Sequence, residues 1–181
     1  MALCACGRNS AMADRRRFLT WAALGSGAAL LGAGVPGRAW GAAKANYFLL
    51  NCIDYRLTAA TTRYMEQRGL TGDYDQLILP GASIGVVTDR QPDWAATFWQ
   101  TLDLARQLHG ISHLIVLEHR DCGAYALVLG EDFANDPSAE TRIHAEMTGK
   151  LAVSLRQRHP EISFEAQLMA LDGTVQRLSA A

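Results

Sequence analysis

The chain has 181 residues, of which 49% are hydrophobic and 19% are charged, with 16 Gly and 5 Pro. This length suits about one domain with an apolar core, and the composition excludes a disordered or low-complexity chain. The formal net charge of −1 provides no basic surface of the kind that nucleic-acid-binding proteins carry.

The first 42 residues are typical of an export signal. Three arginines at 15–17 precede an apolar Gly/Ala-rich run that ends in small residues near 41–43. The pair Arg15-Arg16, followed one residue later by Phe18-Leu19, resembles a twin-arginine signal. We therefore expect the twin-arginine translocase to export the protein to the periplasm, with cleavage of residues 1–42.

An uncleaved signal is the alternative, because residues 18–35 form an apolar stretch of about 18 residues, near the minimum for a membrane anchor. The true start could also be Met12 rather than Met1. Residues 43–181 then form a single domain, with 12 Lys and Arg against 17 Asp and Glu, a net charge of −5. Only Cys52 and Cys122 remain in that domain.

Strands and helices are expected to alternate along residues 43–181. Short apolar runs without period-2 alternation predict buried strands, and apolar residues at helical spacing predict amphipathic helices. The predicted strands cover residues 46–52, 75–81, 113–119 and 163–173. The predicted helices cover residues 57–69, 93–110 and 138–160. This alternation predicts an α/β fold with a mostly parallel central β-sheet flanked by helices.

The functional site is expected at one edge of this sheet. In open parallel sheets, ligands bind beyond the carboxyl ends of the strands. Three segments of the chain fall there, at 52–56, 80–85 and 119–123. We therefore expect chemistry-bearing side chains from these three segments to meet.

Cys52, His119 and Cys122 are the candidate metal ligands in these segments. Two thiolates and one imidazole are a familiar catalytic zinc set that leaves a fourth position for water. A Cys52–Cys122 disulfide, or cysteines packed as small hydrophobes, are the alternatives. The other histidines show no ligand spacing, and we interpret them as exposed or capping residues: His109, His113, His144 and His159.

The tripeptide His119-Arg120-Asp121 also opens the catalytic loop of protein kinases. A kinase needs Asn five residues after the Asp, where Ala126 stands here, and a later Asp-Phe-Gly that this chain lacks. The kinase interpretation is therefore rejected. We interpret Arg120 and Asp121 as a spacer between two metal ligands.

Asp54 and Arg56 follow Cys52 at alternate positions. In an extended chain these three side chains point the same way, so they could converge. Asp54 could accept a hydrogen bond from a metal-bound water and orient it, while Arg56 holds the carboxylate by a bidentate pair. The alternative is a surface salt bridge, which contributes little.

Together, Cys-x-Asp-x-Arg after the first strand and His-x-x-Cys-Gly after the third are similar to the motifs of the β-class carbonic anhydrases. The resemblance covers the chain from about residue 47 to its end. It implies one Zn²⁺ per chain, bound by Cys52, His119 and Cys122, with Asp54 and Arg56 as the catalytic dyad. It also implies a lyase that hydrates carbon dioxide reversibly to bicarbonate with zinc-bound hydroxide, a β-carbonic-anhydrase-like fold, and a homodimer or higher homo-oligomer.

Several positions depart from the family pattern. Tyr55 stands where the family has Ser, Glu118 where it has Gly, and Ala124 where it has a second Gly after the Cys. The family's Arg-Asn-Ala-Gly segment corresponds to residues 79–85, which read LPGASIG. Four small residues are expected to line the substrate pocket: Gly81, Ala82, Ser83 and Gly123.

These departures leave two alternative functions open. An altered pocket wall suits hydrolysis of carbonyl sulfide or carbon disulfide at the same zinc. A non-catalytic zinc-binding or thiol-redox protein is the other alternative, since Tyr55 and Glu118 could crowd or charge the site.

Overall fold

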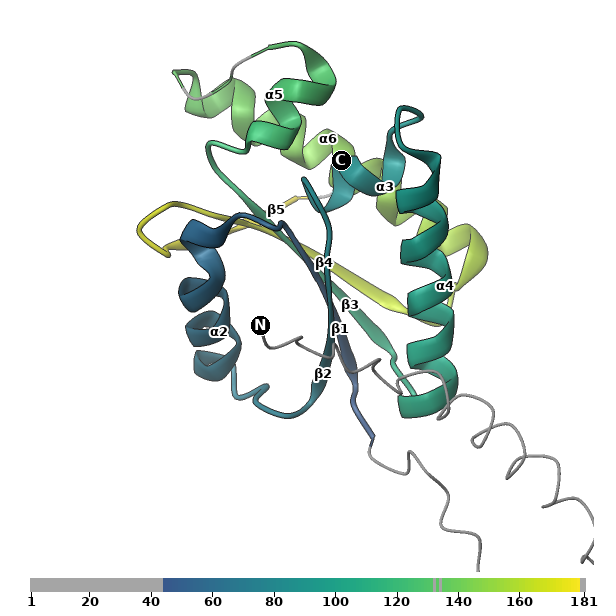
Figure 1. Cartoon of the computed structure of the whole chain (residues 1–181). Coiled ribbons are helices and arrows are strands. Elements are labelled where there is room, and N and C mark those ends of the chain that lie inside the picture. Colours follow the sequence, from purple (N-terminus) through teal and green to yellow (C-terminus); the bar gives the residue numbers. More distant parts are fainter. Residues whose placement is uncertain (1–43, 132, 134, 180–181) are drawn as a thin grey trace, which may run out of the picture. The chain divides into compact units, whose positions relative to one another are not determined.

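The structure, a computed structural model, describes residues 44–131, 133 and 135–179 (Figure 1). The predicted export signal at 1–42 lies outside these residues, so the signal, its cleavage and the alternative anchor stay predictions. Within the described part of the chain, no helix has both the length and the apolar character needed to cross a membrane.

A five-stranded sheet in the order β2-β1-β3-β4-β5 forms the centre of the domain (Figure 1). Its strands are β1 (Tyr47–Asn51), β2 (Tyr74–Ile78), β3 (His113–His119), β4 (Ser163–Met169) and β5 (Val175–Leu178). The first four strands pair in parallel, and β5 pairs with β4 in the antiparallel sense. The predicted α/β fold with a mostly parallel sheet is confirmed.

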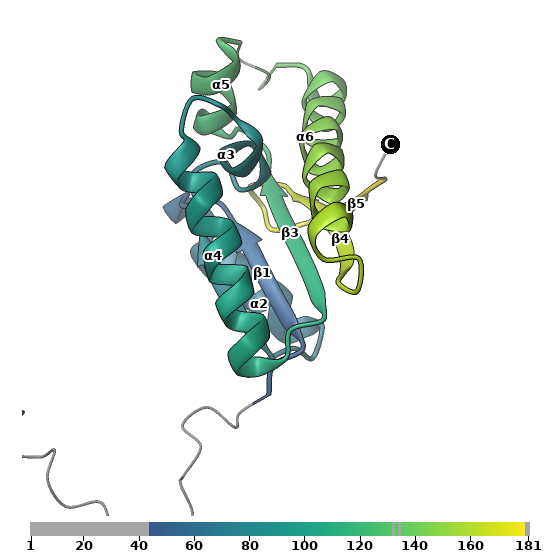
Figure 2. The same cartoon turned by 90° about the vertical axis from the view of Figure 1, so that its right-hand side faces the viewer.

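Helices cover both faces of the sheet (Figure 2). Helix α2 (Thr58–Gln67) lies on one face, and α4 (Pro92–His109) and α6 (Pro137–Arg158) lie on the other. Alternate side chains of β1 point to opposite faces of the sheet: Phe48 and Leu50 pack with α4 and α6, whereas Leu49 packs with α2. A strand buried on both faces has apolar residues at every position, which explains its lack of alternation in the sequence.

Three short helices lie just beyond the carboxyl ends of β1, β2 and β3, and none of them was predicted. They are the 3₁₀ helix η1 (Tyr55–Leu57), α3 (Ser83–Val87) and α5 (Gly123–Leu129). Elements this short contain too few turns to show a helical period in the sequence. Because they begin where the strands end, they surround the edge at which the site was expected.

Two strand predictions need correction. The second strand is at the sheet edge and only partly buried, with Ile78 51% exposed, whereas a buried strand was predicted. The strand predicted at 163–173 ends at Met169, and a turn then leads into the separate strand β5. An apolar run alone does not distinguish an edge strand from a central one, because strand order is set by pairing between distant segments.

Gly85 and Gly149 lie inside α3 and α6 but have different surroundings. A Cβ on Gly85 would lie 2.5 Å from the Pro80 carbonyl oxygen, whereas a Cβ on Gly149 would meet nothing within 4 Å. Gly85→Ala should lower the free energy of unfolding by about 1–3 kcal/mol through overpacking. Gly149→Ala should raise it by about 1 kcal/mol through helix propensity. Urea denaturation measures both changes, and a stabilised Gly85→Ala variant would contradict the close packing of α3.

Candidate metal centre

Two cysteines and one histidine meet at the carboxyl edge of the sheet. Cys52 directly follows β1, His119 is the last residue of β3, and Cys122 immediately precedes α5. Their candidate ligand atoms all lie within 4.8 Å of one another. The cause is the parallel pairing of β1 with β3, which sets Asn51 opposite Leu117 and ends both strands side by side.

The two sulfurs are spaced as ligands of one metal. Cys52 Sγ and Cys122 Sγ lie 3.9 Å apart, and both cysteines are free. A tetrahedral zinc about 2.3 Å from each sulfur would place the sulfurs about 3.8 Å apart. A disulfide would need about 2.05 Å. The sulfur spacing therefore fits a shared metal ion and not the alternative of a disulfide.

The hydrogen bonding of the His119 ring leaves one nitrogen free to bind a metal together with Cys52 and Cys122, and we call these three residues the cluster. Its Nδ1 donates to the Arg120 carbonyl oxygen at 2.8 Å, which leaves the lone pair on Nε2. This Nε2 is buried and has no hydrogen-bond partner among the described residues. A buried polar atom without a partner is costly, and a metal ion would satisfy it. A backbone acceptor for the other nitrogen is the usual support of a metal-binding histidine.

The two thiols differ in their readiness to ionise. Contacts with Cys122 and His119, together with a hydrogen bond from the Gly81 N–H at 3.2 Å, outweigh burial and lower the pKa of Cys52 to about 4. The same contact with Cys52, together with burial, raises the pKa of Cys122 well above its usual range. Burial opposes the charged form of His119, but its contact with Cys52 leaves the pKa of His119 raised. The cluster thus carries a thiolate that attracts a cation.

Asp54 and Arg56 form a bidentate ion pair beside this cluster. Arg56 Nε contacts both carboxylate oxygens of Asp54, at 3.0 and 3.1 Å, and Nη2 contacts Oδ2 at 2.6 Å. This pairing lowers the pKa of Asp54. Asp54 Oδ2 also lies 3.9 Å from His119 Nε2. The Asp54 carboxylate is therefore close enough to contact a group bound at His119 Nε2. Its catalytic role stays a prediction.

Arg120 and Asp121 do more than separate His119 from Cys122. Arg56 donates to the Asp121 side chain at 2.6 Å and to its carbonyl at 2.9 Å. The Asp121 N–H donates to Glu140 Oε1 at 2.5 Å, and Arg120 donates to Glu140 Oε2 at 2.8 Å. The interpretation of these residues as a spacer is therefore incomplete, because their side chains also tie the segment to Arg56 and Glu140. Their partner Glu140 lies on α6, which the local sequence could not indicate.

His144 also differs from its prediction. It was interpreted as an exposed or capping residue, but it is only 1% exposed, and its Nδ1 donates to Glu118 Oε2 at 3.2 Å. Glu118 is equally buried. Because it precedes His119 in β3, its side chain lies on the other face of the strand. Tyr55, the other residue expected to crowd the site, is 86% exposed.

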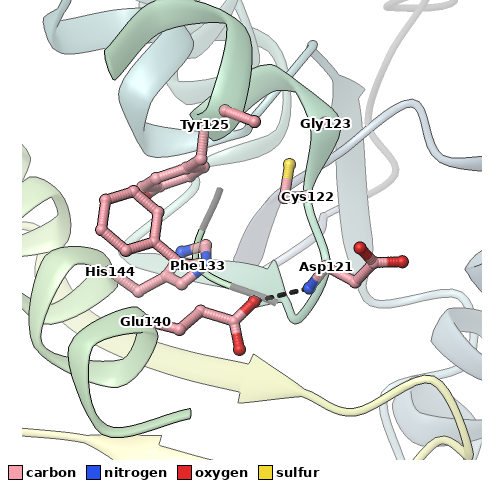
Figure 3. Close-up of a pocket in the computed structure, with 8 residues that line it drawn as sticks. Asp121, Cys122, Gly123, Tyr125, Phe133, Glu140 and His144 are labelled. Carbon is pink, nitrogen blue, oxygen red and sulfur yellow. Dashed lines mark hydrogen bonds between the residues drawn. The ribbon is translucent and has the colours of Figure 1, made fainter. Parts of the chain in front are cut away.

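Two larger hollows lie beside the three candidate ligands in the described part of the chain. One is a cavity of about 230 Å³ beside Cys122, between α5 and α6 (Figure 3). Its lining comprises Asp121, Cys122, Gly123, Tyr125, Ala126, Phe133, Glu140 and His144. The second is a wider surface hollow of about 540 Å³, lined by Ile53, Asp54, Tyr55, Arg56, Asp121 and Gly123. Asp121 and Gly123 border both.

The four small residues expected in the substrate pocket lie in two places. Gly123 lines both hollows. Gly81 and Ala82 lie in the turn between β2 and α3, Ser83 is the first residue of α3, and Ala82 and Ser83 have no exposed surface. Gly81 and Ala82 have positive φ angles of 70° and 44°. The turn aims the Gly81 N–H at Cys52 Sγ, a contact that the sequence pattern did not suggest.

Comparisons with known proteins identify the family of the chain. A family model described as "Putative carbonic anhydrase" matches residues 42–155. Uncharacterized proteins of Rickettsia conorii and Rickettsia bellii are each 33% identical over 135 residues, which cover 75% of this chain and 73% and 82% of theirs.

Among solved structures, the β-carbonic anhydrase CafA of Aspergillus fumigatus aligns with a TM-score of 0.49 at 14% identity, over 93% of this chain and 83% of that one. A tetrameric β-carbonic anhydrase of Sordaria macrospora aligns with a TM-score of 0.46 at 13% identity, over 77% and 83%. The family model spans more than half of the chain and includes Cys52, His119 and Cys122. The chain therefore belongs to the family described as "Putative carbonic anhydrase".

Proposed function

We propose that the protein binds one Zn²⁺ through Cys52, His119 and Cys122 and hydrates carbon dioxide reversibly to bicarbonate. The observation that carries this proposal is the buried His119 Nε2, which has no partner among the described residues and lies within 4.8 Å of two cysteine sulfurs. Membership in the family supports the choice of substrate.

A zinc ion held by Cys52, His119 and Cys122 would supply a Lewis acid that lowers the pKa of water toward about 7. The residues of the chain prepare the site for this chemistry. Asp54, ionised through its pairing with Arg56, is an acceptor that can orient the reacting water. The Gly81 N–H satisfies a lone pair of the Cys52 sulfur and holds its position.

Arg56 acts in this proposal as a restraint on Asp54. It binds the carboxylate through two nitrogens and is itself tied to Asp121, so both ends of the guanidinium are occupied. Asp54 Oδ2 lies 3.9 Å from His119 Nε2, so an unrestrained Asp54 could compete with substrate for a metal that His119 would hold. Arg56 would prevent this competition.

The wider hollow is the proposed route for the substrate. Carbon dioxide is neutral and its product is an anion, so the product is favoured beside a cation. The Arg56 side chain is 35% exposed in this hollow. Both hollows are lined by two carboxylates, Asp54 and Asp121 in the wider one and Asp121 and Glu140 in the cavity beside Cys122, but only the lining of the wider one includes a cation.

Self-association and export involve residues other than the candidate metal ligands. We propose a homodimer or higher homo-oligomer in the periplasm. The exposed Ile53 and Tyr55, 59% and 86% accessible beside the wider hollow, are consistent with a surface that another copy covers.

Loss of a ligand should remove the metal. Cys52→Ser and His119→Ala are expected to lose stoichiometric zinc and hydration activity together, because three protein ligands are needed to hold a catalytic zinc. His113→Ala removes an exposed imidazole from the other end of β3 and serves as the matched control. Elemental analysis of the purified proteins gives the metal content. Stoichiometric zinc in Cys52→Ser would refute the ligand assignment.

Loss of Arg56 should impair catalysis without removing zinc. Arg56→Ala is expected to lower kcat/KM for hydration on the order of 100-fold, because a released Asp54 is misplaced or blocks the metal. Arg63→Ala removes the same charge from the exposed surface of α2 and should leave kcat/KM unchanged. Stopped-flow hydration assays with metal analysis test this. An Arg56→Ala variant with full activity would show that the ion pair has only a structural role.

The substrate itself can be tested by comparing three gases. The zinc-loaded protein should convert carbon dioxide faster than carbonyl sulfide or carbon disulfide in parallel stopped-flow assays. A preference for either sulfur compound would replace the proposed substrate but retain the metal centre. A zinc-loaded protein inactive on all three would favour the non-catalytic alternative.

A further inference from the structure

Glu118 is a buried carboxylate that joins three elements around the metal centre. It is 1% exposed and lies in β3. Its Oε1 accepts the Ser83 N–H at 2.9 Å, and its Oε2 accepts from His144 Nδ1 at 3.2 Å. Both carboxylate oxygens therefore have partners on other elements, Ser83 at the start of α3 and His144 within α6.

The network extends to the first turn of α5. The Ser83 and Tyr125 hydroxyls share a hydrogen bond of 3.1 Å, and the Tyr125 and His144 rings lie with centroids 3.9 Å apart. Tyr125 is fully enclosed, and burial raises its pKa well above the usual range, so it remains a neutral hydroxyl. Figure 3 shows Tyr125, His144 and Cys122 among the residues that line one cavity, and Tyr125 packs in the same apolar cluster as Cys122. The network thus packs directly behind the cluster.

Each member of the network is close in sequence to an atom that shapes the metal centre. Glu118 immediately precedes His119. Ser83 comes two residues after Gly81, whose N–H contacts Cys52 Sγ at 3.2 Å. Tyr125 comes three residues after Cys122, and its N–H donates to the Cys122 carbonyl at 3.0 Å.

We propose that Glu118 is a positioning residue for the metal centre, because it holds the Gly81 turn and the start of α5 at the distances from β3 that bring Cys52, His119 and Cys122 together. The turn needs such a restraint. Gly81 and Ala82 both have positive φ, and a Cβ on Gly81 would lie 3.0 Å from the Ala124 Cβ. A non-glycine residue with positive φ persists only where its surroundings hold it.

This inference rests on the proposed metal centre, so the test begins with zinc binding by the full-length wild-type protein, measured by competition with a chromophoric chelator. Glu118→Met should weaken zinc binding by about 10–100-fold, the range typical for loss of a group that supports metal ligands. Glu118→Gln should bind zinc nearly as wild type does. Its amide oxygen still accepts the Ser83 N–H, and its amide nitrogen can donate to His144 Nδ1 once the imidazole proton moves to Nε2.

A spectrum provides a second readout that does not depend on activity. Absorption by the cobalt(II)-loaded protein reports the geometry of the thiolate and imidazole ligands. It should change in Glu118→Met and stay as in the wild type in Glu118→Gln.

A control separates positioning from general stability. Leu151→Ala truncates a fully buried side chain of α6 that belongs to another apolar cluster. It should lower the Tm of the metal-free and zinc-loaded proteins alike and leave the rise in Tm on zinc addition unchanged. Glu118→Met should reduce that rise, since the rise depends on zinc affinity.

The outcomes distinguish the two proposals. A wild type that binds no zinc overturns the metal centre and this inference with it. If the wild type binds zinc and Glu118→Met matches it in zinc affinity and cobalt spectrum, this inference alone is overturned. The same holds if Glu118→Gln loses as much zinc affinity as Glu118→Met. If Glu118→Met does not fold, Glu118→Asp replaces it, because a side chain one methylene shorter cannot keep both partners. Wild-type zinc affinity in a folded Glu118→Asp variant also overturns the inference.

Discussion

The parallel pairing of β1 with β3 is the constraint on which the rest of the site depends. Because Asn51 pairs with Leu117, both strands end at the same edge, and Cys52 and His119 emerge beside each other although 67 positions separate them. Burial of both faces by α2 on one side and α4 with α6 on the other stabilises this pairing. The apolar core thus determines the position of residues that take no part in it.

The carboxyl edge of the sheet contains charged and polar groups whose burial the apolar core alone would not stabilise. A buried thiolate, an imidazole nitrogen without a partner and an ionised Asp54 would be unfavourable without compensation. Hydrogen bonds from Gly81 and Arg56 stabilise the negative charges. Glu140 fixes the turn at Asp121 by accepting its N–H. A zinc ion would complete this balance, because it interacts favourably with both sulfurs and with the free nitrogen.

Much of this could be predicted from the sequence, for reasons that particular residues make clear. Strands such as 113–119 contain a continuous apolar run, here residues 114–117, so their burial and the parallel sheet could be inferred from the sequence pattern. Cys52, His119 and Cys122 follow strand ends, and the topology then brings them to one edge. The role of Glu118 was not predictable, because its partner His144 is 26 residues away on α6. The same holds for Asp121 and Glu140, whose contact depends on where α6 begins to cross the sheet.

The sequence by itself therefore determined the class of fold, the family motifs and the three side chains that meet at the strand ends, because these depend on local pattern and strand order. The tertiary structure alone decided that β2 is an edge strand, that Gly81 donates to Cys52, and that Glu118 joins α3 and α6. The physical reason is that a buried polar group must find a partner wherever the fold brings one within reach. That partner is set by the packing of α3, α5 and α6 on the sheet, which no short stretch of the chain encodes.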